Sequence, residues 1–274
     1  MMRNTGERVI PDEYRHDPIE FLIFLLHVKS YEHAVPFVRG KRVLDFGCGT
    51  GYGANMLAGD TERLIAVDIS EEAISHAAAS YSAGNLQFLR IDPVETAALP
   101  FPDGDFDVVV SFQVIEHVRH VPTYLREIRR VLRPDGRLLL TTPNSSLRIL
   151  PGWKPWNRFH VREYTYRALK RTLEKEFPFV DVRGINATDP WLEMEKSRVN
   201  RIKWLTAPFT HALVPEVARQ QLLGIAWSRL ANRRRISSQA PGDGAAFPNQ
   251  DDVFITSSVV DRCLKFFAVC GKGP

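Results

Sequence analysis

Short apolar runs alternate with helical patterns along the first two thirds of the chain. Five of these runs have the length and the β-branched content of strands that are buried on both faces. We predict strands at residues 41–45, 64–68, 86–91, 106–112 and 137–142. Strands that alternate with helices favour a parallel sheet with right-handed crossovers, so the predicted fold class is α/β.

Helical signals lie before and between these strands. Apolar residues recur at helical spacing over residues 17–37, ahead of the first strand. Ser70 is a typical N-cap, and Glu71 and Glu72 follow it where negative charge suits the helix dipole. We expect further helices at residues 51–58, 124–132 and 166–176.

The last third of the chain is less regular. It contains a predicted sixth strand at residues 179–184, a mostly helical stretch at 188–235, a loop at 237–252 and a last strand at 264–270. We interpret the chain as a single domain with four parts. They are an N-terminal helical cap (1–40), a core (41–187), a basic helical insertion that forms the acceptor region (188–252) and a closing strand (253–274).

Composition bounds the class of protein. The 274 residues are 44% hydrophobic, which supports one large domain. No segment reaches the ~18–20 apolar residues that span a bilayer, and the signal-peptide pattern is missing, so we expect a cytoplasmic protein. The three cysteines, Cys48, Cys263 and Cys270, form no CxxC pair, and neither disulfides nor a zinc site are expected.

Positive charge is concentrated in one segment. Residues 191–235 hold nine Lys and Arg against three acidic residues, within a chain whose net charge is +4. Such a surface suits an anionic small molecule or a membrane face, and a solvated helix face is the alternative. No basic surface interleaved with aromatic residues is evident, which argues against a nucleic-acid partner.

The stretch DFGCGTGYG at residues 45–53 carries the most specific signal. A phosphate-binding loop of the GxxxxGK[ST] kind needs a lysine, and none is near. A dinucleotide fingerprint fits only the register of Gly49, Gly51 and Ala54, which displaces the turn by two residues from the strand end. An NAD(P)-dependent oxidoreductase remains the alternative on that register.

Three carboxylates, Asp45, Asp68 and Asp92, stand at consecutive strand ends, where ligands of open parallel sheets bind. A carboxylate repels a pyrophosphate but suits a cation. S-adenosylmethionine has an ammonium and a sulfonium, a ribose diol for Asp68, and an adenine amino group for Asp92. Each acid, taken singly, has a helix cap or a turn residue as its alternative role.

Four stretches resemble class I S-adenosylmethionine-dependent methyltransferases. They are VLDFGCGTGYG (43–53), LIAVDIS (64–70), ID before LPFPDGDFDVVVSFQVIEHV (91–118) and LREIRRVLRPDGRLLLTTPN (125–144). The resemblance implies a Rossmann-like sheet of seven strands, mostly parallel, with the last strand antiparallel. It also implies S-adenosyl-L-methionine as the cofactor.

The resemblance assigns cofactor contacts residue by residue. Asp45, Gly47 and Gly49 match the methionine-end contacts, and Asp68 matches the ribose ligand. Ile69 would pack on the adenine and Gln113 would flank the methionine part. Asp92 would read the adenine, whereas Pro93 lacks the N–H that the family usually offers there. The resulting cofactor-binding set is Asp45, Gly47, Cys48, Gly49, Asp68, Ile69, Asp92, Pro93 and Gln113.

A finer resemblance concerns the acceptor. GERVIP at the N-terminus, KSYEHA before the first strand and FHVREYT (159–165) are similar to methyltransferases encoded with enzymes of bacterial cell-surface polysaccharides and glycolipids. This implies O-methylation of a sugar or glycolipid-type acceptor. A non-catalytic protein that only binds S-adenosylmethionine is the second alternative.

An oxygen nucleophile of high pKa needs a base near the methyl group. Glu116 and His117 follow the fourth strand, and His160 follows the fifth, so all three are candidate catalytic residues. Histidine suits this work because its ordinary pKa is near 6.5. A packing or helix-capping role is the alternative for His117. No metal-ligand spacing is visible, and we expect no metal.

Overall fold

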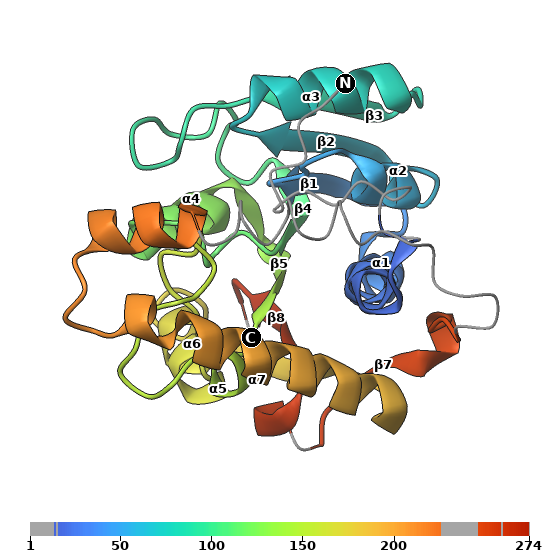
Figure 1. The fold of residues 1–274 in the computed structure, drawn as a ribbon. Coiled ribbons are helices and arrows are strands. Elements are labelled where there is room, and N and C mark those ends of the chain that lie inside the picture. Colours follow the sequence, from blue (N-terminus) through green and yellow to red (C-terminus); the bar gives the residue numbers. More distant parts are fainter. Residues whose placement is uncertain (1–13, 15, 226–245, 259, 274) are drawn as a thin grey trace.

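An eight-stranded sheet forms the centre of the molecule, in the order β3-β2-β1-β4-β5-β8-β6-β7 (Figure 1). The computed structural model describes residue 14 and residues 16–225, 246–258 and 260–273. Its strands are β1 (Arg42–Phe46), β2 (Arg63–Asp68), β3 (Leu86–Arg90), β4 (Phe106–Phe112), β5 (Leu132–Pro143), β6 (Phe179–Ala187), β7 (Val253–Thr256) and β8 (Lys265–Gly271).

The first five strands pair in parallel, as predicted. β8 lies antiparallel between β5 and β6, which confirms the expected antiparallel last strand. The predicted total of seven strands is wrong, because β7 pairs antiparallel with the end of β6 at the sheet edge. β7 has only four residues, of which one is buried, so its apolar run is too short to indicate a separate strand.

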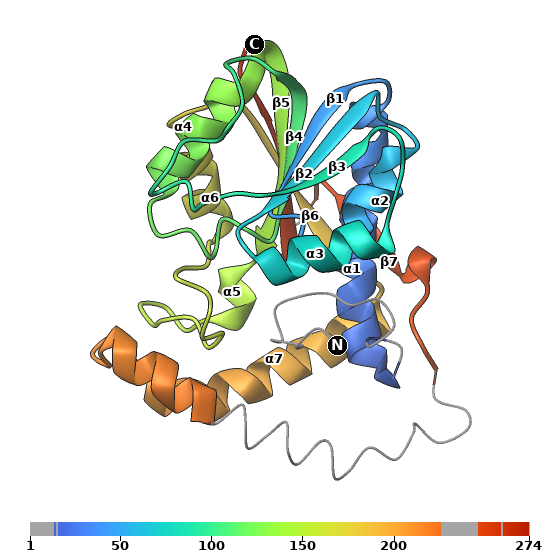
Figure 2. The same cartoon turned by 90° about the horizontal axis from the view of Figure 1, so that it is seen from above.

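Helices cover both faces of the sheet (Figure 2). One face carries α1 (Pro18–Val38), α2 (Tyr52–Ala58) and α3 (Glu71–Ser80), and the other carries α4 (Val121–Val131) and α6 (Tyr166–Leu173). Asp17 caps α1 by accepting from Ile19 N and Glu20 N. The predicted N-terminal helix is thus confirmed to within one residue at each end.

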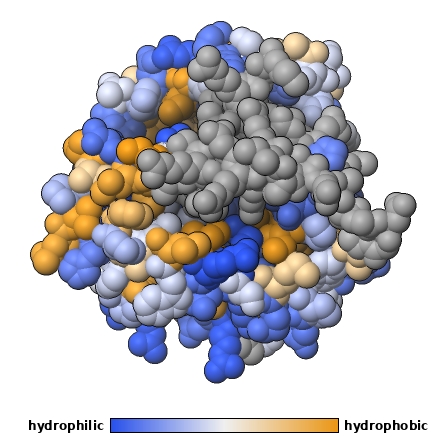
Figure 3. Space-filling view, in the orientation of Figure 1, coloured by the Kyte–Doolittle hydropathy of each residue, from blue (hydrophilic) through white to orange (hydrophobic). Residues whose placement is uncertain are grey.

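The predicted insertion before the last strand is helical over the described residues. It contains α7 (Asp189–Thr210) and a helical segment at residues 216–225, and α7 packs against α1 and α5 (Ser145–Arg148). The part of the prediction on residues 226–245 lies outside the described residues. Figure 3 shows apolar surface on the side of this insertion, where Trp204, Leu205 and Leu213 are exposed.

None of the described helices combines the length and the apolar character that a membrane crossing requires.

Candidate active site

A pocket of about 590 Å³ lies at the carboxyl ends of the first four strands. The neighbours β1 and β4 are where the strand order reverses, which is the position expected for a ligand in an open sheet. Its wall is built by α1, by the loops after β1, β2, β3 and β4, and by Phe159 from the loop after β5.

The glycine loop forms the floor of this pocket. Gly47 and Gly49 both have positive φ, which side chains rarely adopt. A Cβ on Gly47 would lie 2.4 Å from Val114 Cγ2, so a side chain is excluded there. A Cβ on Gly49 would meet nothing within 4 Å. The loop therefore leaves an open cradle in which a ligand can approach the backbone of Gly49, and Cys48 lines the same wall.

Asp68 stands on the pocket wall at the end of β2. Its Oδ2 accepts from the Gly49 amide at 3.1 Å, and its Oδ1 accepts from the Ser70 amide at 2.8 Å. These two bonds fix the carboxylate beside the glycine loop, and its remaining lone pairs can accept from a ribose diol. Ile69 follows with 58% exposure, which offers an apolar face for a flat ring.

Asp45 is fully buried at the end of β1, beneath the pocket wall rather than on it. Neither of its oxygens reaches a hydrogen-bond partner among the described residues, although the Tyr31 hydroxyl is a close neighbour. Burial, together with the charge of Asp68, raises the pKa of Asp45 to about 7. A cationic ligand above Tyr31 would satisfy this carboxylate, so the acid fits the ammonium end of S-adenosylmethionine.

The loop after β3 differs from expectation at Asp92. Ile91, Pro93, Val94 and Glu95 line the pocket, whereas Asp92 is exposed and forms an ion pair with Arg90 at 2.7 Å. The structure therefore does not bring Asp92 to the site, and Glu95 is the carboxylate on this wall. Glu95 accepts from the Arg119 amide at 3.1 Å, a contact that no local pattern indicates.

The end of β4 turns sharply toward the pocket. Gln113 lines the wall with φ of 58°, the one described residue other than glycine with positive φ. Such backbone costs roughly 1–3 kcal/mol and persists where the surroundings hold it. Here the Gln113 side chain donates to Thr141 Oγ1 at 3.0 Å, and its backbone N–H donates to Thr141 O at 2.9 Å.

Helix α1 closes the pocket from the opposite side. Its residues His27 and Tyr31 line the pocket. Burial, with a smaller contribution from Lys265, holds the pKa of His27 well below its ordinary value, so this imidazole is neutral. The sequence analysis missed His27, because apolar residues surround it in a helical pattern.

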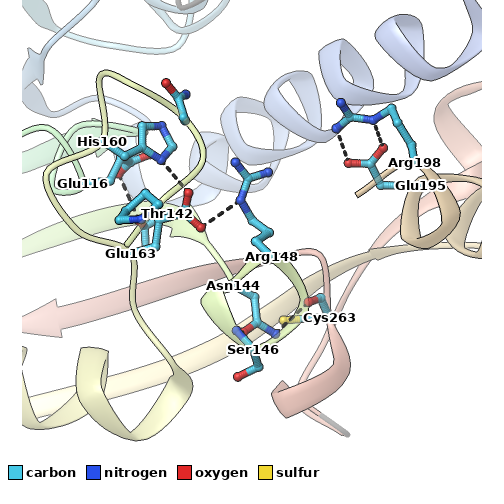
Figure 4. A network of polar contacts seen from close by, with 12 residues as sticks. Glu116, Thr142, Asn144, Ser146, Arg148, His160, Glu163, Glu195, Arg198 and Cys263 are labelled. Atoms are coloured by element: carbon cyan, nitrogen blue, oxygen red, sulfur yellow. Dashed lines mark hydrogen bonds and ion pairs between the residues drawn. The ribbon is translucent and has the colours of Figure 1, made fainter. Parts of the chain in front are cut away.

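The three candidate catalytic residues converge beside the pocket, and Figure 4 shows two of them, Glu116 and His160. Each of Glu116, His117 and His160 offers a ligand atom, and these atoms lie within 4.8 Å of one another. His117 lines the pocket, whereas Glu116 and His160 are buried behind it. Glu116 Oε2 accepts from Thr142 Oγ1 at 2.9 Å, and the His117 Nδ1 lies 3.3 Å from Phe159 O.

Glu163 holds His160 in place, because its Oε1 lies 2.7 Å from His160 Nδ1 and its Oε2 accepts from Arg148 Nε at 2.8 Å. Burial alone would raise the pKa of Glu163, but the charge of Arg148 and the bond to His160 outweigh it and keep the pKa at about 2. The sequence places Glu163 with His160 and Tyr164 after the fifth strand, and the structure adds its contacts to Arg148 and His160.

The insertion fixes the loop that carries His160. The buried Arg219 donates to the backbone carbonyls of Pro155, Asn157 and His160 at 2.6, 3.2 and 3.2 Å. On the other side of this loop, Val161 N donates to Glu116 O at 2.8 Å. The basic insertion therefore contributes at least one cation to the architecture of the site rather than to the surface.

The fold and the glycine cradle define a Rossmann-like protein that binds a nucleoside with a cationic tail. A family model described as a methyltransferase domain matches residues 44–140. A probable S-adenosylmethionine-dependent methyltransferase of Mycobacterium tuberculosis is 40% identical over 179 residues, covering 65% of this chain. The chain spans 61% of that relative's length.

A probable S-adenosylmethionine-dependent methyltransferase of Mycolicibacterium smegmatis is 37% identical, with 66% of this chain and 67% of the relative covered. The crystal structure of the YcgJ protein from Bacillus subtilis shares the fold at 20% identity, with a TM-score of 0.53 over 89% of this chain and 98% of that one. The chain belongs to the S-adenosylmethionine-dependent methyltransferases, and S-adenosylmethionine is the cofactor of this family. The dinucleotide register at Gly49 is thereby set aside.

Proposed function

We propose that the protein transfers a methyl group to a hydroxyl oxygen of a small polar acceptor, a sugar or glycolipid headgroup that carries negative charge. The observation that supports it best is the position of Glu116, His117 and His160. They adjoin the pocket just beyond Gln113, the residue that resembles the family's contact to the methionine part. A weakly acidic hydroxyl oxygen needs a group that accepts its proton at this position.

The mouth of the pocket supports a charged, ring-shaped acceptor. Phe159 lies on the wall with 38% exposure, and the Arg158 guanidinium lies 4.4 Å from the centre of its ring. An exposed aromatic face next to an arginine can bind a sugar ring and an attached phosphate or carboxylate. Arg162 and Arg119 lie on the adjacent surface, where Arg162 donates to Arg119 O at 2.9 Å.

In this proposal the protein residues bind, orient and exclude water. S-adenosylmethionine, when bound, supplies a methyl group on a positively charged sulfur. Asp68 accepts from the ribose hydroxyls, Asp45 balances the ammonium, and Tyr31 with His27 covers the donor from α1. His117 lies where the acceptor oxygen must lose its proton, so the products are a methyl ether, the neutral thioether and one proton. Orientation and loss of water supply most of the acceleration.

A labelled-methyl screen tests this proposal. Wild-type protein is incubated with labelled S-adenosylmethionine and with phosphorylated sugars, nucleotide-sugars, glycolipids, neutral sugars and small phenols. We expect transfer to sugar hydroxyls, with anionic sugars preferred over their neutral counterparts. Transfer confined to phenols would contradict the acceptor class. Tight donor binding without transfer to any acceptor would favour the non-catalytic alternative.

A further inference from the structure

We infer that Glu116, His117 and His160 form a binding site for one divalent transition-metal ion of the Zn²⁺ type, beside the methyl-transfer centre. The inference rests on the proposed function, because such an ion would act on the acceptor hydroxyl. Figure 4 shows Glu116 and His160 side by side, one from the loop after β4 and the other from the loop after β5.

The ligand set carries the first argument. Two imidazoles and one carboxylate form the protein ligands of several catalytic zinc sites, and they leave a fourth position open for a substrate oxygen. The candidate ligand atoms already lie within 4.8 Å of one another. A tetrahedral shell with bonds of about 2.1 Å needs about 3.4 Å between ligands, a closure that side-chain rotations can supply.

The second argument is independent and concerns Glu116. The residue is 0% exposed, and its Oε1 has no hydrogen-bond partner among the described residues. Only Oε2 is satisfied, by the hydroxyl of Thr142. A buried carboxylate oxygen without a donor is costly, and the Glu116 carboxylate lies beside the two histidines. A cation held between these three side chains would offset that cost.

The surroundings of both histidines favour metal binding. Phe159 O can only accept, so His117 Nδ1 donates to it, and Nε2 carries the lone pair of the neutral ring. His160 Nδ1 lies 2.7 Å from Glu163 Oε1, so in the neutral ring its Nε2 carries the lone pair as well. A carboxylate or a backbone carbonyl behind a ligating histidine is the usual arrangement in metalloproteins, because it fixes the tautomer and the ring orientation.

The ion would serve the proposed reaction without any change of oxidation state. A hydroxyl oxygen of the acceptor at the open position becomes more acidic, and its proton leaves to water. The oxygen lone pair then forms the bond to the methyl carbon. The bond between that carbon and sulfur breaks, and sulfur keeps its electron pair.

Direct metal titration tests the site. The full chain is freed of metal with a chelator and titrated with Zn²⁺ in a calorimeter, and with Co²⁺ while the visible absorption of the ion is recorded. We expect one ion per chain and a Co²⁺ spectrum typical of four ligands that include imidazole. Glu116→Gln and His160→Ala should each weaken binding at least about 100-fold, and Glu163→Gln about tenfold, as for partners behind metal ligands.

His120→Ala is the matched control. The His120 imidazole is exposed and lies 2.6 Å from Thr123 Oγ1, outside the proposed ligand set, so its loss should change Zn²⁺ affinity less than about twofold. Thermal melting of each variant checks the fold, and Glu163→Gln keeps the test valid if Glu116→Gln fails to fold.

Two results would overturn the inference. One is a wild-type chain that takes up no Zn²⁺ or Co²⁺, and the other is equal affinity in wild type, Glu116→Gln and His160→Ala. If no ion binds but an acceptor is methylated, the metal site fails while the proposed function stands, with His117 as general base. If one ion binds but no acceptor is methylated, the metal site stands and the proposed function fails.

Discussion

The two walls of the site are built in different ways. On the cofactor wall, the glycine loop and Asp68 stand directly at the ends of strands, and the backbone amides of Gly49 and Ser70 hold Asp68. On the acceptor wall, His117 and Phe159 are 42 positions apart, and the loop of His160 is bonded to Arg219 from the insertion. The cofactor wall is therefore local, whereas the acceptor wall depends on long-range packing.

This difference leads to a separation of effects. Changes on the cofactor wall should weaken donor binding, and changes on the acceptor wall should lower turnover while donor affinity stays the same. Each of the following predictions can break or sharpen that separation.

The largest effect is expected at Asp68. Asp68→Ala removes the ribose acceptor and leaves the Gly49 amide without its partner. We expect donor affinity to fall about 100-fold, which corresponds to about 2.7 kcal/mol. Calorimetry with S-adenosylmethionine measures it. Asp92→Ala is the control from the same sheet edge, and an equal loss there would show that the assignment of the wall is wrong.

Arg219→Ala should come next. It removes the guanidinium donor from three backbone carbonyls, so we expect the free energy of unfolding to fall by about 3 kcal/mol and turnover by about 30-fold. Donor affinity should change less than about twofold. Denaturant unfolding, calorimetry and steady-state kinetics measure the three quantities. Arg201→Ala, an exposed arginine of α7, is the control. A loss of donor affinity in Arg219→Ala would contradict the separation of the two walls.

A smaller effect concerns pH. Burial raises the pKa of Asp45 in the folded chain to about 7, well above the ordinary pKa of an aspartate. At pH values between the ordinary pKa and about 7, the folded chain therefore binds more protons than the unfolded chain. Stability should therefore decrease as pH rises through this window. Donor affinity should increase about tenfold between pH 6 and pH 8, since the ionised carboxylate faces the ammonium. Calorimetry at both pH values measures it, and Asp45→Asn should remove the pH dependence. An unchanged dependence in that variant would exclude Asp45 as its source.

Much of the fold could be predicted from the sequence, because parallel strands buried on both faces leave continuous apolar runs. The cofactor wall was predictable for the same reason, since Gly47, Gly49 and Asp68 directly follow such runs. β7 was missed because its four residues are too few to stand out as a strand. β5 begins at Leu132, ahead of the predicted residue 137, because exposed residues at its start interrupt the apolar pattern.

The acceptor wall was harder to predict. The sequence named Glu116, His117 and His160 separately, and only packing shows that they meet. The sequence predicts no metal because no motif has the spacing of metal ligands. Such a pattern cannot reveal ligands that come from two separate loops, and the metal site that we infer differs from this prediction. Asp92 shows that position alone can also mislead. It follows a strand as predicted, but its side chain pairs with Arg90 instead of facing the pocket.

The most direct test of the account is turnover in His117→Ala at saturating donor, with His120→Ala beside it. The account predicts donor affinity within about twofold of wild type and turnover reduced at least about 100-fold, because His117 adjoins the reacting oxygen without holding the donor. Wild-type turnover in His117→Ala at every pH would contradict it.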